Sequence, residues 1–365
     1  MQPMIYFDHN ATTFLRNEVK AILANIGREP SNASSIHAYG RVARRELEEA
    51  RSSLKKALNI NNSYDLLFTA SGTEANNLLI NGFAGSHKII ISNVEHASIY
   101  KASDELEVVR VLDNGSIDLE HLEFLLQQNE KIIVSVIYAN NETGIIQPIQ
   151  EITALAHKYN ALMHTDAVQA LGKIPVDFTK TGVDLMTISA HKCGGLHGAA
   201  ALIYKKNLEF IPLIKGGGQE KSKRAGTENT IAIKCFAEAA GISIAEIPLY
   251  EQQVKYLRDY IEDALQGYAM VVGKDQPRLP NTSTIIMKNV PRGTQIIHFD
   301  LNKIAVSSGS ACSSGKIDTS HVLTAMNIEH ADSAIRISLG MENNKDEADK
   351  FIKTWLELYK QTNKG

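Results

Sequence analysis

Short apolar runs alternate with helix-like patterns through the middle of this chain, and this alternation constrains its fold more than any other feature. Several runs are apolar at consecutive positions, as expected of strands in a mainly parallel sheet covered by helices on both faces. Helical patterns lie between some of them, including 118–128 and 149–159. The sequence therefore predicts a large α/β layer. The runs lie at 65–69, 88–92, 108–112, 132–137, 161–165, 184–188 and 200–204.

A second set of elements follows the first. After a polar, glycine-rich segment at 214–230, which we expect to be a loop, a helical pattern spans 254–265. Strand candidates follow at 283–287 and 334–339, and a final helix is expected from about residue 345. Since about 150 residues per domain is typical, a chain of 365 residues is expected to form two domains. The second would be a smaller α/β domain.

Composition excludes several classes of protein. The 38 basic and 41 acidic residues give a net charge of −3, unlike the basic surface of a nucleic-acid-binding protein. Three cysteines cannot form a disulfide framework, which favours a reducing compartment. No apolar stretch reaches the roughly 18 residues of a membrane helix, and the start has no signal- or transit-peptide pattern. We therefore expect a cytoplasmic protein without direct contact to membrane or nucleic acid.

Polar and titratable residues follow the predicted strands. In open α/β sheets, ligands bind beyond the carboxyl ends of the strands, so these residues are candidates for a common site. A candidate phosphate-binding turn, a carboxylate, an imidazole and a lysine at these strand ends indicate a functional site more specifically than ordinary polar loops would. The segments are Ser71-Gly72-Thr73, Glu95-His96, Asn140-Asn141, Asp166 and Ser189-Ala190-His191-Lys192.

Each candidate also has a purely structural interpretation. The small-residue turn at 71–73 could bind a phosphate or only cap a helix. Lys192 could form a Schiff base with a carbonyl compound or simply be solvated. Asp166 could pair with a protonated ring nitrogen, as pyridoxal phosphate requires, or cap a helix. His96 could stack on a flat ring and move protons near pH 7, or be a buried, hydrogen-bonded histidine.

One of the three cysteines has a distinctive setting. Cys312 lies in the small-residue segment 307–315, where an exposed thiol could attack a bound substrate and carry the product away. Cys193 directly follows Lys192, and Cys235 lies in an apolar helical stretch. We expect both of these thiols to be structural.

In combination these residues resemble a known family. The whole chain is similar to the cysteine desulfurases of the NifS/IscS type, which belong to the class-V aminotransferases and to the fold-type I pyridoxal-phosphate enzymes. The Ser-Ser-Gly-Ser-Ala-Cys segment looks like the long-loop group of that family. The segments that carry the resemblance, in chain order, are 6–13, 31–37, 165–169, 189–192, 308–312 and 335–340.

The resemblance implies a division of the fold. Residues 15–250 would form a large cofactor-binding domain, with a mainly parallel seven-stranded sheet between helices. Residues 1–14 and 251–365 would form a small α/β domain that carries Cys312.

The resemblance also implies roles around pyridoxal 5′-phosphate, and no bound metal. Lys192 would form the Schiff base, and Asp166 would pair with the ring nitrogen. Gln169 would contact the ring hydroxyl, while His96 would stack on the ring and assist proton transfer. Thr227 would reach the phosphate held by the other subunit, which implies a homodimer. The residues that would hold the phosphate within one subunit are Gly72, Thr73, Ser189 and His191.

The implied reaction converts L-cysteine to L-alanine. Asn32, Asn141 and Arg336 would bind the substrate carboxylate, with Asn141 also close to the cofactor. Cys312 would take the sulfur as a persulfide and pass it to an acceptor, either an iron–sulfur scaffold or a tRNA-thiolation enzyme.

Two departures from the family pattern and three alternatives stay open. Segment 193–198 replaces the Tyr-Gly-Pro-Lys-Gly often found there. The chain ends soon after the last predicted helix, whereas some relatives carry a longer tail that helps to dock the scaffold, so the acceptor is left undecided. The alternatives are a selenocysteine lyase, an aminotransferase and a non-catalytic sulfur carrier or scaffold.

Overall fold

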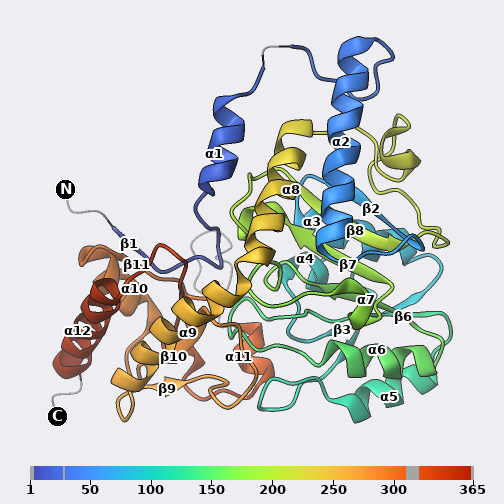
Figure 1. Cartoon of the computed structure of the whole chain (residues 1–365). Helices are drawn as coiled ribbons and strands as arrows, with labels where there is room; N and C mark the ends of the chain where they lie inside the picture. The colour runs from blue at the N-terminus through green and yellow to red at the C-terminus, as the bar shows by residue number, and fades with distance from the viewer. Residues whose placement is uncertain (1–3, 28, 310–319, 363–365) are drawn as a thin grey trace.

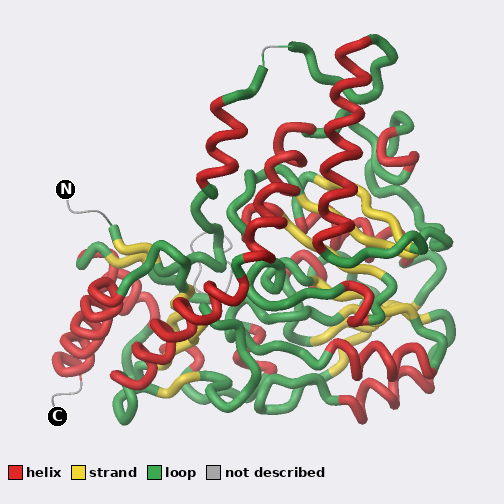
Figure 2. The backbone as a smooth tube through the Cα atoms, in the orientation of Figure 1, coloured by secondary structure: helices red, strands yellow, loops and turns green. Residues whose placement is uncertain are grey.

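A seven-stranded sheet forms the centre of the larger part of the molecule (Figures 1 and 2). The computed structural model describes residues 4–27, 29–309 and 320–362. The strands lie in the order β2-β8-β7-β6-β5-β3-β4, and neighbouring strands from β4 to β7 are parallel, while β8 is antiparallel to β7 and β2. The predicted mainly parallel sheet is thus confirmed. Its strands are β2 Tyr64–Thr69, β3 Lys88–Ser92, β4 Glu107–Val109, β5 Ile132–Ser135, β6 Leu162–Asp166, β7 Leu185–Ser189 and β8 Ala200–Lys205.

Successive residues of these strands face two separate apolar cores, which explains why the runs are apolar at every position. Leu67 packs in a cluster with side chains of α3, whereas its neighbour Leu66 packs in the cluster that contains α2 and α8. Ile133 and Val134 divide between the same two clusters. The helices of this part are α1 Asn17–Ala24, α2 Ala38–Ala57, α3 Gly72–Phe83, α4 Ala97–Tyr100, α5 Leu119–Gln128, α6 Ile149–Lys158, α7 Phe178–Thr181 and α8 Thr230–Ala245.

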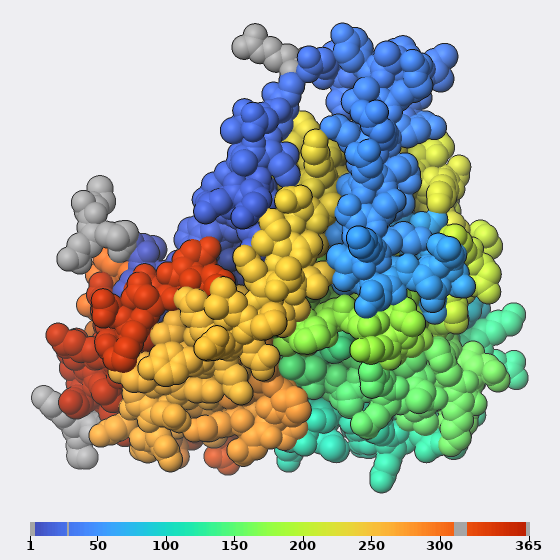
Figure 3. All heavy atoms as spheres, in the orientation of Figure 1, coloured from blue at the N-terminus to red at the C-terminus, as the bar shows by residue number. Residues whose placement is uncertain are grey.

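A long helix that the sequence analysis did not single out, α2, packs beside α8, and α1 also lies against α8 (Figures 1 and 3). The buried positions of α2 include Ala43, Leu47, Ala50 and Leu54, a spacing of three or four residues that places them on one face. That face provides the contact with the sheet and α8.

A buried ion pair anchors the segment 214–230, which was expected to be a loop. Before α8 begins at Thr230, its only described regular element is a 3₁₀ turn, η2 at Gln219–Ser222. Within it, Glu220 has a positive φ of 44° and is buried. Its carboxylate accepts two hydrogen bonds from the Arg51 guanidinium at 3.0 and 2.9 Å, and one from the backbone N–H of Phe68 at 2.9 Å. This polar loop is therefore tied to both α2 and β2.

A second apolar core lies beside the first part. Phe7, Phe299, Phe351 and Trp355 share this core, so the N-terminal strand packs with elements from the end of the chain. β10 pairs antiparallel with β12 and β9, and β1 pairs parallel with β11. The elements are β1 Ile5–Tyr6, α9 Ile247–Ala264, β9 Met270–Val271, β10 Thr282–Ile286, α10 Arg292–Leu301, β11 Ile304–Ala305, β12 Ala334–Ser338 and α12 Lys345–Thr362. α11 His321–Ala325 packs with the first part instead, because its buried Val322 and Leu323 belong to the core that contains α2 and α8. The domain boundaries at 14–15 and 250–251 stay a prediction.

Two short 3₁₀ turns complete the described elements, η1 at Ala190–Lys192 and η3 at Ala331–Ser333. The first begins where β7 ends and carries two of the predicted site residues. Among the helices of residues 4–27, 29–309 and 320–362, none combines the length and the apolar character required to cross a membrane.

Candidate functional site

A cavity of about 600 Å³ lies where the carboxyl ends of the sheet strands face the second core. Its walls come from distant parts of the chain, because Asn10 and Ala11 contribute from the N-terminal segment and 306–309 from the second core. The predicted site residues that line it are Gly72, Thr73, His96, Asn141, Asp166, Gln169, Ser189, His191, Lys192 and Arg336.

Three predicted residues are not placed in this wall. Asn32 is exposed, and its Oδ1 accepts a hydrogen bond from the backbone N–H of Ser34 at 2.9 Å. Thr227 is also exposed. Neither lines the cavity as the described residues form it. Cys312 lies outside the described residues, although Ser308 and Gly309 line the cavity.

One end of the cavity is formed by the first turn of α3 and by η1. Ser71 is the N-cap of α3, and its Oγ accepts from the N–H of Glu74 at 3.1 Å, so the cap interpretation holds for Ser71. Gly72 approaches Val168 so closely that a Cβ at position 72 would stand 3.2 Å from Val168 Cγ2. A helix N-terminus with hydroxyl side chains close by is suited to bind an anion.

His191 stands at this same end as a neutral imidazole. Burial and the nearby charge of Lys192 lower the pKa of His191 to about 3. Its Nδ1 lies 3.3 Å from Thr12 Oγ1. The ring can therefore offer an N–H group to an anion without carrying a charge itself.

Asp166 is held firmly at the end of β6. Its Oδ1 accepts from the N–H of Val168 at 2.9 Å, and its Oδ2 accepts from Asn76 Nδ2 at 2.8 Å. Asn76 also donates to Ser98 Oγ at 2.8 Å. Asp166 thus makes a local backbone contact like that of a capping residue and also lines the cavity, so the structural and the functional interpretations both apply to it.

His96 is hydrogen-bonded and also faces the cavity. Its Nδ1 accepts from the backbone N–H of Ser98 at 3.1 Å, which places the proton of the neutral ring on Nε2. Burial, together with the positive charge of Lys192 and a contribution from His321, lowers the pKa of His96, while Asp166 opposes that shift. The imidazole is therefore neutral at pH 7 and has Nε2 as its donor.

Lys192 has the properties of a nucleophilic lysine. Burial and the positive charge of Arg336 lower the pKa of Lys192 to about 8, against smaller opposing effects of Asp8 and Asp166. Its Nζ donates to the carbonyl oxygens of Asn10 and Ala11, the latter at 2.7 Å. A much larger fraction of such an amine is unprotonated at neutral pH than of an ordinary lysine, which makes it a better nucleophile and base.

Arg336 extends from β12 of the second core into the opposite wall. Its Nη2 donates to Asp8 Oδ1 at 2.5 Å and its Nη1 to the carbonyl of Asn141 at 2.9 Å. Its Nε is buried and has no hydrogen-bond partner among the described residues. A guanidinium with an unsatisfied donor in a cavity is suited to bind a carboxylate with two bonds.

Sequence reasoning missed two residues that contact the predicted ones. The buried Asn10 and Lys173 lie behind Gln169: Gln169 Nε2 donates to the Asn10 carbonyl at 2.9 Å, and Lys173 Nζ donates to Gln169 Oε1 at 2.5 Å. The spacing of Gln169 and Lys173, four residues within a turn, was the one available signal. Asn10 lies within segment 6–13, which carried the family resemblance, but nothing in the sequence placed it beside Gln169.

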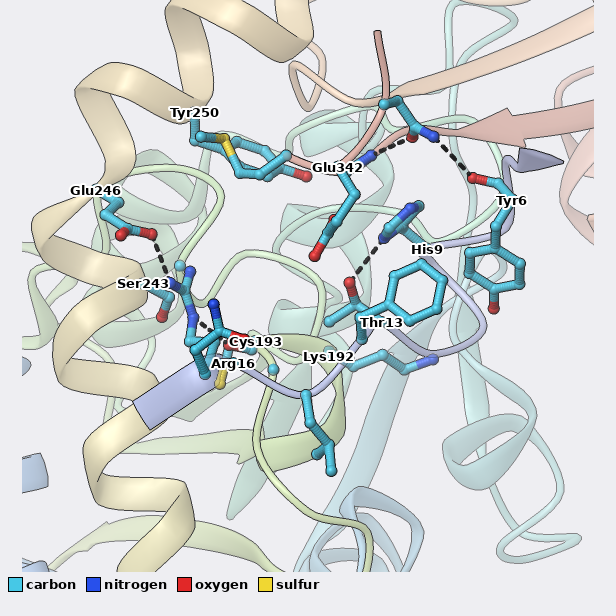
Figure 4. A pocket seen from close by; sticks show the side chains of 18 of the residues that line it. Tyr6, His9, Thr13, Arg16, Lys192, Cys193, Ser243, Glu246, Tyr250 and Glu342 are labelled. Carbon is cyan, nitrogen blue, oxygen red and sulfur yellow. Dashed lines mark hydrogen bonds and ion pairs between the residues drawn. The ribbon is translucent and has the colours of Figure 1, made fainter. Parts of the chain in front are cut away.

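A second cavity, of about 620 Å³, lies on the other side of Lys192 (Figure 4). Lys173 lines it as well. Figure 4 shows Arg16 between Glu246 and Cys193, with Arg16 Nη1 2.5 Å from Glu246 Oε2. Lys192 lines both cavities.

The two cysteines expected to be structural are buried and free. Cys193 and Cys235 form no disulfide with each other. Burial raises the pKa of the Cys193 thiol to about 11, which makes it a poor nucleophile. The structural interpretation of both is confirmed.

Known proteins share this fold and much of this sequence. The sequence pattern of the family described as Aminotransferase class-V matches residues 5–351. Cysteine desulfurase IscS of Dictyoglomus turgidum is 39% identical over 366 residues, which cover 95% of this chain and 92% of that protein. Cysteine desulfurase NifS of Azotobacter vinelandii is 35% identical, covering 96% of this chain and 91% of its own.

Solved structures of other proteins are also similar to this chain. A NifS-like protein from Rickettsia africae superposes with a TM-score of 0.92 at 41% identity, covering 98% of this chain and 99% of that one. A structure described as SspA in complex with cysteine gives a TM-score of 0.78 at 26% identity, covering 92% of this chain and 98% of the other. The predicted fold class is confirmed.

Proposed function

Because this chain belongs to the class-V aminotransferase family, we propose that it is a cysteine desulfurase that depends on pyridoxal 5′-phosphate. The observation that carries the proposal is the cavity in which Lys192, Asp166 and Arg336 meet. They supply an amine of lowered pKa, a fixed carboxylate and a guanidinium with an unsatisfied donor.

The residues of the cavity fit this cofactor. Lys192 offers an amine for its aldehyde, and Asp166 offers a carboxylate for its ring nitrogen. The first turn of α3, with Gly72 and Thr73, together with Ser189 and His191, offers donors for its phosphate. When bound, the cofactor supplies an acceptor for the negative charge that develops at the α-carbon of an amino acid.

Lys192 would act as the base. A group whose pKa lies near the working pH is efficient in proton transfer, and the pKa of about 8 places Lys192 Nζ in that range. We assign to this atom the removal of the α-proton of the substrate. His96, neutral and with its proton on Nε2, would pass protons at the same face.

Arg336 would bind the substrate carboxylate. Its Nε has no partner among the described residues, and its Nη2 would exchange Asp8 Oδ1 for a substrate oxygen, so that the two N–H groups could hold the two oxygens of a carboxylate side by side. Asn141 lines the same wall and would add a further contact. Asn32 remains a proposed carboxylate ligand, although it does not line the cavity within this chain.

Cys312 would accept the sulfur. In the net reaction, L-cysteine and the Cys312 thiol give L-alanine and a persulfide on Cys312, so the S–C bond of the substrate breaks and an S–S bond forms. This assignment rests on the resemblance of the segment around Cys312. The neighbouring Ser308 and Gly309 already line the cavity.

The wider setting is also a proposal. Thr227 is exposed, which is compatible with a homodimer in which it reaches the phosphate held by the partner. The sulfur would go to iron–sulfur cluster assembly or to tRNA thiolation. The free thiols of Cys193 and Cys235 support a reducing compartment, and we propose the cytoplasm.

Purified protein with pyridoxal 5′-phosphate provides the test. We expect a visible absorbance band that changes when L-cysteine is added, and alanine and sulfide in equal amounts under reducing conditions. Lys192→Ala should abolish the band, and Cys312→Ser should keep the band but release no sulfide.

The matched control is Cys235→Ala, which removes another thiol and should leave turnover intact. Alanine without sulfide would contradict desulfuration. Amino-group transfer to a keto acid would instead indicate an aminotransferase, and a protein that stays colourless with excess cofactor would indicate a non-catalytic role.

A further inference from the structure

Lys173 is a buried lysine without a carboxylate partner. Its side chain is 4% exposed, and none of the ion pairs among the described residues includes it. Its Nζ instead donates to two neutral amide oxygens, Asn10 Oδ1 at 2.8 Å and Gln169 Oε1 at 2.5 Å. Burial lowers the pKa of Lys173 well below its usual range, and the charge of Lys192 adds to that effect. Because burying an amine without a carboxylate partner costs folding free energy, we expect this lysine to have a specific role.

The contacts of Lys173 determine which way the Gln169 amide faces. Because Lys173 Nζ donates in both of these bonds, the atom of Gln169 that faces it is the amide oxygen. The Nε2 of Gln169 then donates to the Asn10 carbonyl at 2.9 Å, which also accepts from Lys192. If the Gln169 amide were reversed, its Nε2 would face the Lys173 amine, which is also a donor. Its Oε1 would then face the Asn10 carbonyl oxygen, which is also an acceptor.

Asn10 itself is held from all sides. Its Oδ1 accepts from Lys173 and from Asn281 Nδ2 at 3.0 Å. Its Nδ2 donates to Thr282 Oγ1 at 2.8 Å and to the Asn141 carbonyl at 3.1 Å. Because every polar atom of the Asn10 side chain is engaged, the position of its carbonyl, and with it that of Gln169 Nε2, is fixed.

We propose that Lys173 is a positioning residue that fixes the Gln169 amide as an N–H donor toward the cavity, where it recognises an oxygen anion on the ring of the bound cofactor. This inference rests on the proposed function, because it assumes that a hydroxylated pyridine ring occupies the cavity. Lys173 does not line that cavity, so it acts through Gln169 and not by direct contact. It assigns a role in cofactor recognition to a residue that would otherwise be counted as part of the core.

The test measures selectivity for the ring hydroxyl. The probes are pyridoxamine 5′-phosphate, which has the hydroxyl but no aldehyde to react with Lys192, and its 3-deoxy analogue, which lacks the hydroxyl. Both are titrated into full-length, cofactor-free protein. A donor aimed at a charged oxygen corresponds to a preference of about 10-fold for the hydroxyl compound in the wild type.

Lys173→Met should reduce this preference to about 3-fold, because the Gln169 amide then keeps only the Asn10 carbonyl as its anchor and its N–H is aimed less firmly at the cavity. Lys173→Arg retains N–H donors, and the second cavity, which Lys173 lines, gives it room, so it should restore most of the preference. Lys20→Met is the matched control: it removes another lysine that lines the second cavity but donates to Asn17, and it should leave the preference unchanged.

A double variant separates positioning from charge. If Lys173 acts through Gln169, Lys173→Met should have no further effect on the preference in a Gln169→Leu background. If it acts directly through its charge, the two effects should add, and this result would overturn the inference. If Lys173→Met does not fold, Gln169→Glu tests the same contact, because it keeps a partner for Lys173 but has no N–H. A retained preference in Gln169→Glu would also overturn the inference.

The wild-type titration separates a failure of the proposed function from a failure of the role assigned to Lys173. Absence of binding for both phosphate compounds would contradict the proposed function itself. Binding with an equal preference in the wild type and in Lys173→Met would contradict only the role of Lys173.

Discussion

The two walls of the cavity differ in how far their polar atoms are already satisfied. On the sheet wall, formed by His96, Asp166 and Gln169, the side chains are held by hydrogen bonds within the same part of the molecule or from Asn10. On the second-core wall, Arg336 has a buried Nε without a partner among the described residues. The sheet wall is thus organised to hold a resident group, whereas the second-core wall has binding capacity left for a molecule that comes and goes.

The largest effect is expected on the sheet wall. Asp166→Asn removes the charge that would keep the ring nitrogen protonated, and it keeps only one of the two oxygens that accept from Asn76 and Val168. Turnover of L-cysteine should fall by about 10³-fold, a loss of roughly 4 kcal/mol. Steady-state sulfide release measures it.

The control for that experiment is Asp118→Asn, which changes the aspartate that caps α5, away from the cavity. It should leave turnover unchanged. An Asp166→Asn enzyme with nearly normal turnover would show that the sheet wall does not act on the ring nitrogen.

A smaller and different effect is expected on the second-core wall. Arg336→Lys keeps the charge but loses the planar pair of donors, so the KM for L-cysteine should rise by about 10- to 100-fold. The visible absorbance of the bound cofactor should be unaffected. Arg258→Lys, in the second core but remote from the cavity, should leave KM unchanged; loss of cofactor absorbance in Arg336→Lys would contradict the division of labour between the walls.

The pH dependence of Lys192 tests how both walls act on one atom. Since the amine reacts only when unprotonated, the rate at which cofactor-free protein combines with pyridoxal 5′-phosphate should rise with pH and level off above about 8. Arg336→Met removes a positive charge that lowers the pKa of Lys192, so the midpoint should move upward. Asp166→Asn removes a negative charge that raises it, so the midpoint should move downward. Stopped-flow absorbance measures the pH midpoint of each variant. Shifts in the same direction would contradict the opposite effects that we assign to Arg336 and Asp166.

The smallest effect concerns the phosphate end. Gly72→Ala places a Cβ 3.2 Å from Val168 Cγ2, so the neighbour must shift slightly, and the affinity for pyridoxamine 5′-phosphate should fall by less than about 10-fold. Gly241→Ala in α8 meets no atom within 4 Å. It should leave affinity unchanged and increase the free energy of unfolding by about 0.5–1 kcal/mol. Fluorescence titration and urea denaturation compare the two variants.

Sequence alone predicted the sheet well because its strands are buried on both faces. The run at 88–92 coincides with β3. The run at 108–112 is longer than β4, which ends at Val109, because the N–H groups of Arg110 and Val111 bond to the His121 and Asn93 side chains instead of a strand. Such side-chain contacts depend on tertiary structure and leave no periodic signal.

The site was predictable where a residue lies at or just beyond the end of a strand. Asp166 ends β6 and Lys192 lies in η1 just after β7, and the structure brings both to the cavity. For Lys173 the sequence offered only its spacing from Gln169, because its other partner, Asn10, is 163 residues away in the chain. Asn32 and Thr227 remain predictions, since neither lines the cavity within one chain.

The position of Asn10 has a consequence for biosynthesis. The backbone N–H of Asn10 donates to Ser338 Oγ, a partner 328 residues later in the chain. The sheet can form while the rest is still being synthesised, whereas the first residues must wait for residue 338 before they close the wall behind Lys192. Nascent chains interrupted before residue 338 should therefore be folded in part yet unable to retain the cofactor.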